Sequence, residues 1–403
     1  MISNNMKNKL RPIVLFVASV ALSFIIFSCG NSKKADSDEI VLEGRFIHSR
    51  ANIVYFDVIH VESTERIDSI VLDEDGAFQL RYPTKKPVFI KLFTAEDNFI
   101  TLVAEPGELI TLSGDINALA ESYTVSGSPA SELVAKYLEF TRGQYKQLDT
   151  LSLIWENNKY SNNKLVLRDS LDSLAKTIFS DQRNHVLDVI HKNPESLGSL
   201  FVLYQFFGRN PVLDPFEYFN DYESLAKTLS AKYPDFEHVG HLNMRVNKTR
   251  LAIQEEEEIK LRLDTGKVAP DFTLPDINEK MVRLSDLKGN IVLVHFWASW
   301  SAESVRQLSA LRYYNQIYGP KGLVILSVSF DYDKDMWEKA IDDEDMKWYN
   351  LSDLKYTDSP ISKLYHIEQT PYFYLLDRNQ TITKKSSNID DIGNAIYKLF
   401  FAH

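Results

Sequence analysis

A run of apolar residues in the C-terminal third gives the clearest structural signal in the chain. Ile291–Trp297 holds six apolar or aromatic residues, interrupted once by His295, and contains neither proline nor glycine. Such a run is typical of a strand buried on both faces, as in a parallel α/β sheet. From Ser301, good helix formers continue through Ala310, with apolar side chains at helical spacing. Ser301 fits the N-cap of this helix, because its hydroxyl can accept a hydrogen bond from a free backbone N–H of the first turn.

The pattern upstream changes from strands to helices. Within residues 39–126, short apolar runs are separated by turn signals, and Ala77–Tyr82 alternates apolar and polar side chains with period two. This pattern predicts a small antiparallel β-sandwich. Residues 127–263 show helical periodicity instead, and Ser128 and Pro129 fit the N-cap and first position of the first helix. The predicted helices cover residues 129–157, 163–192, 195–207, 215–232 and 236–262.

The composition excludes several classes of function. With 44% hydrophobic and 25% charged residues, the chain of 403 residues has the make-up of an ordinary globular protein. Its net charge of −11 argues against a nucleic-acid partner and against a basic surface that docks on membranes. The histidines of the predicted helices lack the spacing of metal-binding motifs, so we expect no metal and no cofactor. These histidines are His185, His191, His238 and His241.

The single cysteine, Cys29, follows a segment with the features of a signal peptide. Three basic residues precede an apolar run, 13–27, that is too short to span a membrane comfortably. Residues 26–30, Ile-Phe-Ser-Cys-Gly, resemble a bacterial lipobox. The resemblance implies that residues 1–28 are removed and that the sulfur of Cys29 carries diacylglycerol. A secretory signal or signal anchor with an incidental cysteine is the alternative.

A lipid anchor at Cys29 would place the protein in the bacterial cell envelope. Residues 29–38 are small and polar, so we expect them to act as a flexible tether. The expected location is the outer membrane with the protein facing the periplasm, and the alternative is the outer surface of that membrane.

Residues 264–403 contain several recognisable motifs. The first is F-W-A-S-W at Phe296–Trp300. It resembles the active-site strand and turn of the thioredoxin-like TlpA/ResA group, which is related to the alkyl-hydroperoxide-reductase/thiol-specific-antioxidant superfamily. Val268–Leu274 resembles its A-P-D-F-x-L strand, Arg283–Gly289 its L-S-D-L-K-G turn, and Tyr365–Pro371 its Y-x-V-x-x-x-P segment. The resemblance implies a thioredoxin-like α/β domain. More weakly, the β-rich N-terminal region resembles a β-domain of unknown function that is often fused to lipoprotein thioredoxins.

The redox cysteines of that group are absent. Where the group has C-x-x-C, this chain has Ser301-Ala302-Glu303-Ser304. A helix N-terminus favours a thiolate, but a serine hydroxyl is too weakly acidic to form an alkoxide near neutral pH and cannot form a disulfide. We therefore expect the turn to keep its shape without dithiol chemistry, which argues against an enzyme. Hydrolysis by Ser301 has little support, because the sequence identifies no histidine placed to activate it, and His295 is expected to be packed in its strand.

Residues around this turn are also candidates for ligand binding. The resemblance aligns the Thr370–Pro371 bond with the cis-proline of thioredoxin-like proteins, which lies beside the redox turn. Trp300 is expected at the surface and Trp297 in the core, and simple packing is the alternative for Trp300. The helix dipole favours Glu303 in the first helical turn, which is a simpler explanation than a general base. The candidates are Trp300, Ser301, Ala302, Glu303, Thr370 and Pro371.

Three functions are compatible with these features. The leading interpretation is a non-redox, thioredoxin-like lipoprotein that binds a peptide, a protein or a small ligand at the turn. The second is a participant in envelope thiol–disulfide homeostasis, which the resemblance implies. In the third, the C-terminal domain is structural and the β-rich domain carries the binding.

Overall fold

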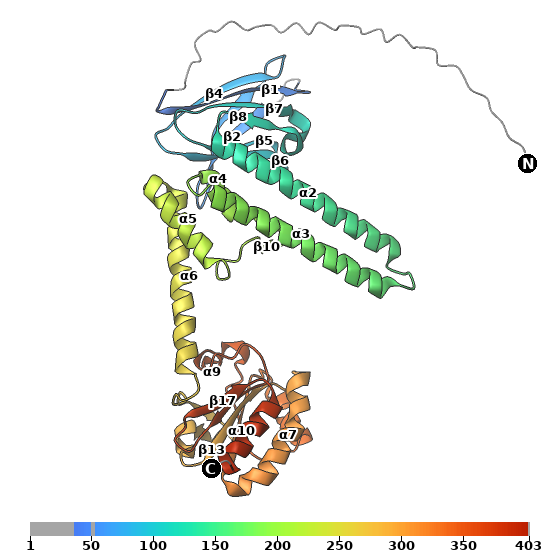
Figure 1. Cartoon of the computed structure of the whole chain (residues 1–403), viewed down its shortest axis with the longest axis vertical. Coiled ribbons are helices and arrows are strands. Elements are labelled where there is room, and N and C mark those ends of the chain that lie inside the picture. Colours follow the sequence, from blue (N-terminus) through green and yellow to red (C-terminus); the bar gives the residue numbers. More distant parts are fainter. Residues whose placement is uncertain (1–35, 50–52, 402–403) are drawn as a thin grey trace, which may run out of the picture. The chain divides into compact units, whose positions relative to one another are not determined.

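The computed structural model describes residues 36–49 and 53–401, and this part of the chain forms two compact units, divided between Phe207 and Gly208 (Figure 1). The expected signal peptide and lipidation site lie outside the described residues. Within those two ranges, no helix is both long and apolar enough to cross a membrane. The boundary between the two units falls inside the predicted helical region, 127–263.

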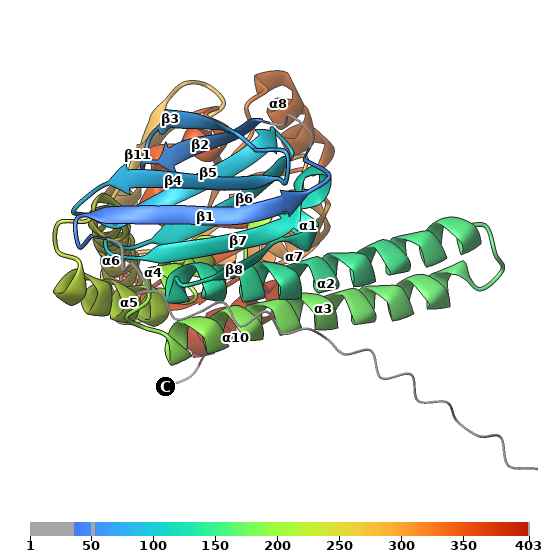
Figure 2. The same ribbon diagram turned by 90° about the horizontal axis from the view of Figure 1, so that it is seen from above.

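Two four-stranded sheets form the β-rich part of the first unit, in the orders β4-β1-β7-β8 and β3-β2-β5-β6 (Figure 2). Apolar side chains of both sheets share one core, among them Leu42 of β1 and Ile90 of β5. One pair departs from the predicted antiparallel arrangement, because β1 pairs in parallel with β7. A parallel pair needs a long connection, and here the intervening strands supply it. The strands are β1 (Glu39–Ile47), β2 (Ile53–Ile59), β3 (Thr64–Val71), β4 (Ala77–Pro83), β5 (Val88–Ala95), β6 (Asn98–Ala104), β7 (Leu109–Asp115) and β8 (Thr124–Ser126).

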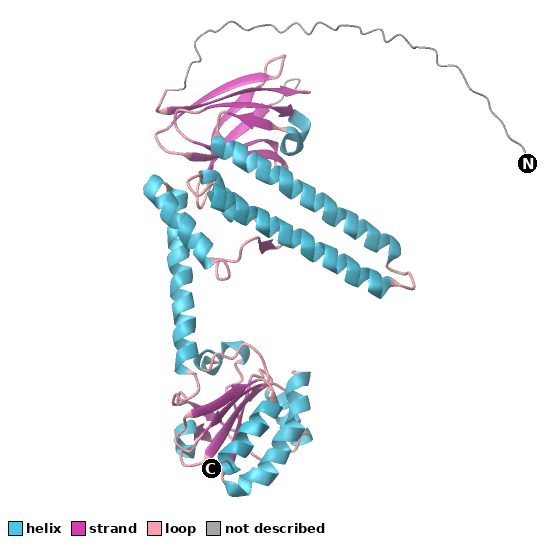
Figure 3. Ribbon diagram, in the orientation of Figure 1, coloured by secondary structure: helices cyan, strands magenta, loops and turns pink. Residues whose placement is uncertain are grey.

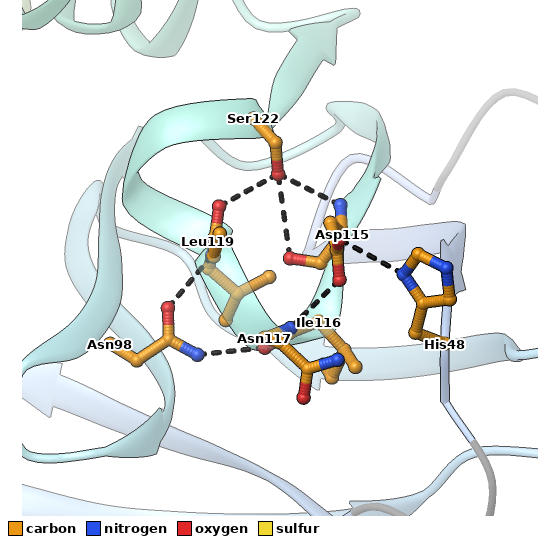
Figure 4. A network of polar contacts seen from close by, with 8 residues as sticks. His48, Asn98, Asp115, Ile116, Asn117, Leu119 and Ser122 are labelled. Carbon is orange, nitrogen blue, oxygen red and sulfur yellow. Dashed lines mark hydrogen bonds and ion pairs between the residues drawn. The ribbon is translucent and has the colours of Figure 1, made fainter.

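One corner of the sandwich is held by the side chain of Asn98 (Figure 4). Its amide nitrogen donates to the carbonyl of Ile116 and to the hydroxyl of Thr94, both at 2.7 Å. Its amide oxygen accepts from the backbone N–H of Leu119, also at 2.7 Å. Leu119 begins the short helix α1 (Leu119–Ser122), so one side chain joins the start of β6 to this helix.

Asp115, at the end of β7, organises the same corner from the other side (Figure 4). One of its carboxylate oxygens accepts from the backbone N–H of Asn117 at 3.0 Å, and the other lies 2.9 Å from Nδ1 of His48. Both contacts lower the pKa of Asp115, and the hydrogen bond from the backbone of Asn117 has the larger effect. The hydroxyl of Ser122 in turn accepts from the backbone N–H of Asp115 at 2.8 Å.

Two long helices, α2 (Pro129–Asn158) and α3 (Lys164–Lys192), extend from the sandwich as an antiparallel hairpin, followed by α4 (Leu197–Leu203) and β9 (Phe206–Phe207) (Figure 2). Ser128 caps α2 by accepting from the backbone N–H of Ser131 at 3.4 Å. The hydroxyls of Ser128 and Ser131 both donate to the carbonyl of Val103 in β6, at 2.9 and 2.8 Å. These bonds fix α2 on the sandwich, so the first helices belong to the same unit.

The second unit begins with β10 (Asn210–Pro211) and the helices α5 (Phe219–Lys232) and α6 (Glu237–Arg262). Leu263, directly after α6, is buried in the core of the C-terminal sheet, so this end of α6 is packed against that core. The remaining elements are β11 (Thr273–Pro275), β12 (Met281–Arg283), β13 (Ile291–Trp297), α7 (Ala302–Tyr318), β14 (Leu323–Ser329), α8 (Lys334–Asp343), β15 (Tyr349–Ser352), α9 (Pro360–Leu364), β16 (Tyr372–Leu376), β17 (Ile382–Ser386) and α10 (Ile389–Phe401).

A five-stranded sheet, in the order β15-β14-β13-β16-β17, is flanked by helices in this unit (Figure 3). Every residue of β13 is buried, as its apolar run predicts. The sheet is mixed rather than parallel, because β13 pairs in parallel with β14 but antiparallel with β16. Side chains of β13 alternate between two cores, one of which contains residues of α7 and α10. The turn after β13 is thereby fixed by a fully buried strand on one side and a packed helix on the other.

Candidate functional site

Ser301 occupies the N-cap of α7, as the sequence predicts. Its hydroxyl oxygen accepts a hydrogen bond from the backbone N–H of Ser304 at 3.3 Å. The same hydroxyl donates to the carbonyl of Thr370 at 3.3 Å. The Thr370–Pro371 bond is cis, and the expectation that it lies beside the turn is confirmed.

Ser304 differs from Ser301 in its surroundings. Its side chain is fully buried, and its hydroxyl oxygen has no hydrogen-bond partner within the described part of the chain. A buried hydroxyl without a partner costs roughly 1–3 kcal/mol of desolvation free energy. A thiol at the same place would lose much less, because S–H is a weak donor that behaves as a small apolar group. The pocket around Ser304 therefore suits a thiol or a methyl group better than it suits serine.

A buried carboxylate, Asp331, holds the turn from the side of β14. Its oxygens accept from the backbone N–H of Ser299 at 3.1 and 3.2 Å and from the Ser299 hydroxyl at 2.7 Å. The hydroxyl of Ser329 also donates to this carboxylate, at 2.5 Å. Asp331 was not among the site residues expected from the sequence. Its position soon after a buried strand is the one feature of the sequence that could have indicated a role. Its partner Ser299 could not be identified, because it lies 32 residues away in the sequence.

A groove of about 550 Å³ runs beside the turn, between α7, the loop before β16 and the start of α10. Of the six predicted binding residues, Glu303, Thr370 and Pro371 line it, whereas the other three do not. The carboxylate of Glu303 accepts from Gln307 at 2.6 Å and pairs with Arg306. Glu303 is thus engaged with its own helix, and no nucleophile is among these partners.

Trp300 lies at the surface, as predicted, with 54% of its area exposed, whereas Trp297 is fully buried. The ring of Trp300 contacts Tyr356 with centroids 5.6 Å apart, and Tyr356 meets Tyr332 edge-on at 6.4 Å. All three rings are substantially exposed. This aromatic cluster (Trp300, Tyr332 and Tyr356) was not found from the sequence, because its members come from three separate segments of the chain.

His295 is packed in β13, as expected. Its Nδ1 lies 3.0 Å from the hydroxyl of Ser327, and its ring stacks on Phe373 with centroids 4.8 Å apart. Within the described residues its Nε2 has no hydrogen-bond partner. Complete burial lowers the pKa of His295 to about 3, so the imidazole is neutral at physiological pH. The Nδ1 atom contacts Ser327 of the core strand β14. His295 makes no described contact with Ser301, so it is not placed to activate that hydroxyl.

One group of side chains has the composition of a metal site. Ligand atoms of Glu256, His366 and Glu368 lie within 4.8 Å of one another. Lys260 pairs with Glu256, and Nε2 of His366 lies 3.3 Å from a carboxylate oxygen of Glu368. These acidic groups already face cationic or donor partners, so we interpret the group as an ion-pair cluster.

Residues 265–385 match the AhpC/TSA family. Among curated proteins, the thiol-disulfide oxidoreductase ResA of Bacillus cereus is 25% identical over 126 residues, which are 31% of this chain and 71% of that protein. ResA of Oceanobacillus iheyensis is 31% identical over 121 residues, and the match spans 29% of this chain and 62% of that protein.

A solved structure, the C-terminal domain of a putative thiol-disulfide oxidoreductase from Bacteroides thetaiotaomicron, is 29% identical. The match covers 34% of this chain and 97% of the chain of that structure, with a TM-score of 0.33. The family match covers the part of the chain that contains β13, α7 and the turn between them. The C-terminal part of the chain is therefore a thioredoxin-like domain of the AhpC/TSA type, homologous to the ResA thiol-disulfide oxidoreductases.

Proposed function

We propose that this protein is a lipid-anchored binding module of the bacterial cell envelope, in which a thioredoxin-like domain has lost its dithiol and binds a ligand at the turn. The observation that carries the proposal is the pair of serines. Ser301 is the N-cap of α7, and Ser304 is buried one helical turn later. These are the two positions at which the resembling group has its cysteines. Thiol–disulfide exchange needs an attacking thiolate and a second thiol, and neither serine supplies one.

The groove beside the turn favours an extended peptide over a small apolar ligand. Its lining is mostly polar and presents carboxylate, amide and hydroxyl groups at the surface. Such groups match the N–H and C=O groups of an unpaired peptide backbone. Trp300, which is exposed next to the turn, offers an anchor for an apolar side chain of the same peptide.

Binding is tested with the full chain and a displayed library of random peptides. We expect enriched peptides whose affinity falls about tenfold or more in Trp300→Ala, and by a smaller factor in Glu303→Gln. The matched control is Tyr313→Ala, which removes another exposed aromatic ring of the second unit. If the enriched peptides bind all four proteins equally, binding does not occur at the turn, and the β-rich domain becomes the better candidate.

Participation in thiol–disulfide chemistry is the second candidate, because the curated relatives are named thiol-disulfide oxidoreductases. Reduction of insulin by dithiothreitol separates the two. The wild-type protein should not accelerate the reaction, whereas Ser301→Cys combined with Ser304→Cys should, since the first thiol sits at a helix N-terminus and the second one turn later. Each single variant is the control and should stay inactive. Catalysis by the wild type contradicts the proposal.

The lipid anchor is tested separately by labelling living cells with a palmitate analogue. The wild-type chain should take up the label, and Cys29→Ser should not. A native N-terminus at Met1, found by mass spectrometry of the purified protein, would refute both cleavage and lipidation.

A further inference from the structure

The hairpin of α2 and α3 has a third layer over only part of its length. Midway along the hairpin, Phe207 packs between the two helices, with ring centroids 4.6 Å from Tyr145 and 5.0 Å from Phe179. The helix α4 also packs on both α2 and α3. The last buried side chain of α2 is that of Gln144, and beyond it toward the tip α2 has none.

The same face continues beyond Phe207 as an open groove of about 560 Å³, here called the distal groove. Leu148 lies three residues after Tyr145, and Ala175 lies four residues before Phe179, so they are the next positions along the same faces of the two helices. Its floor is apolar and its rim is polar or charged. The floor consists of Leu148, Leu151, Trp155, Leu171 and Ala175, and the rim of Ser152, Glu156, Arg168 and Asp172.

Two helices cannot enclose a core by themselves, because each has an apolar stripe that needs cover from more than one neighbour. Phe207 and α4 provide that cover over part of the hairpin, and no described segment lines the distal groove apart from the hairpin itself. Leu165, three residues before Arg168 in α3, is 62% exposed. The distal half of the hairpin therefore has the surface of half a four-helix bundle.

We propose that a second copy of this chain covers the distal groove, so that two hairpins form a four-helix bundle. A two-fold axis parallel to the hairpins sets α2 of each copy against α3 of the other at the same distance from the sandwich. Glu156 of one copy then faces Arg168 of the second copy, and the reverse pair forms as well. Within the chain, Glu156 pairs with Lys159 and Arg168 lies 3.8 Å from Asp169, but these are exposed pairs that exchange at little cost.

The local charge favours a copy over other occupants. Residues 145–179 contain five basic and four acidic residues, whereas the whole chain carries −11. Two hairpins can therefore approach with little of the repulsion that other surfaces of two such acidic proteins would meet. A membrane surface is a poorer occupant, because the rim of the groove carries both signs of charge rather than the basic face of helices that lie on anionic lipid.

Charge exchange at the rim tests the proposal without altering the apolar floor. The full chain is purified in a density-matched nonionic detergent, and its mass is measured by sedimentation equilibrium. We expect the wild type to be a dimer at micromolar concentration. Glu156→Arg and Arg168→Glu should each raise the dissociation constant about tenfold or more, because each creates two like-charge contacts. The double variant restores both pairs and should recover most of the affinity.

Cross-linking in intact cells provides a second measurement that is free of detergent. Ser152→Cys puts a thiol on the groove rim, and Leu153→Cys puts one on the neighbouring position, which faces away from the groove. A short bismaleimide should give a species of twice the chain mass with Ser152→Cys and much less with Leu153→Cys or the wild type.

Three results would overturn the proposal. One is a wild type that stays monomeric at tens of micromolar. Another is an equal yield of the cross-linked dimer with Ser152→Cys and with Leu153→Cys. The third concerns lipid: if wild-type protein binds vesicles of phosphatidylglycerol and phosphatidylethanolamine, and either charge reversal changes that binding but not dimer formation, the distal groove contacts membrane instead.

Discussion

The corner of the β-sandwich and the interior of the C-terminal domain treat buried polar groups in opposite ways. At the corner, the amide of Asn98 has three hydrogen bonds, all at 2.7 Å. In the C-terminal domain, Ser304 Oγ and His295 Nε2 are buried with no partner among the described residues. A satisfied buried group strengthens its surroundings, whereas an orphaned one lowers the free energy of unfolding.

The difference separates two kinds of polar residue. Asn98 is explained by the two backbone groups and the Thr94 hydroxyl that it joins, so its role is structural. Ser304 lowers stability where it stands, and packing gives no reason for a hydroxyl at that position. Residues that lower stability in this way are expected mainly at positions selected for function. The turn is such a place, and the corner is not.

The largest expected effect is the loss of stability of the C-terminal domain in acid. Because burial holds the pKa of His295 near 3, the unfolded chain binds a proton below about pH 6.5 while the folded domain does not. The contribution of neutral His295 to the free energy of unfolding is therefore fully present above about pH 6.5. It is lost as the pH decreases from about 6.5 towards 3, and the loss is on the order of 3–5 kcal/mol. His295→Leu should remove most of this slope.

Urea unfolding at pH 7 and pH 4, followed by tryptophan fluorescence, checks this prediction. Four of the five tryptophans belong to the second unit, so the signal reports mainly on that unit. Equal acid sensitivity of wild type and His295→Leu would show that other groups carry the pH dependence.

The corner is expected to give the next largest effect. Asn98→Ala removes three hydrogen bonds and leaves the N–H of Leu119 and the carbonyl of Ile116 without that partner. The free energy of unfolding of the first unit should fall by about 2–4 kcal/mol. Calorimetry of the full chain measures it, with the exposed neighbour Asp97→Ala as the control. A loss below about 1 kcal/mol would mean that water replaces the amide, and the contrast with Ser304 would weaken.

The smallest effects have opposite signs at the two serines. Ser304→Ala should stabilise the second unit by about 1 kcal/mol, because it removes a buried hydroxyl without a partner. Ser301→Ala should destabilise it by about 1 kcal/mol, because the N-cap bond to Ser304 is lost. Denaturation followed by tryptophan fluorescence measures both. Destabilisation by both substitutions would indicate that Ser304 has a partner, such as a bound water.

Patterns local in the sequence predicted much of the fold. The buried strand at Ile291–Trp297 and the helix caps at Ser128 and Ser301 all depend on a few neighbouring residues. The parallel pair of β1 and β7 could not be found in this way, because register across many intervening residues leaves no local mark. β3 (Thr64–Val71) was missed because it is a largely exposed strand with no apolar alternation.

The site divides along the same line. Its centre, Ser301 to Ser304, and the cis bond before Pro371 were expected from motifs. The contacts of Asp331, the aromatic cluster and the distal groove were not, since each joins residues that only the tertiary fold brings together.

The hydrogen bonds of Asp331 also bear on how such a domain changes over evolutionary time. They fix the turn through Ser299 and Ser329, and neither residue belongs to the tetrad from Ser301 to Ser304. The contacts that hold the turn are thus separate from the side chains of Ser301 and Ser304. Exchange of serine for cysteine at either position, or the reverse, would leave these contacts of Asp331 in place, so the reactivity of the turn can change during evolution without a redesign of the loop.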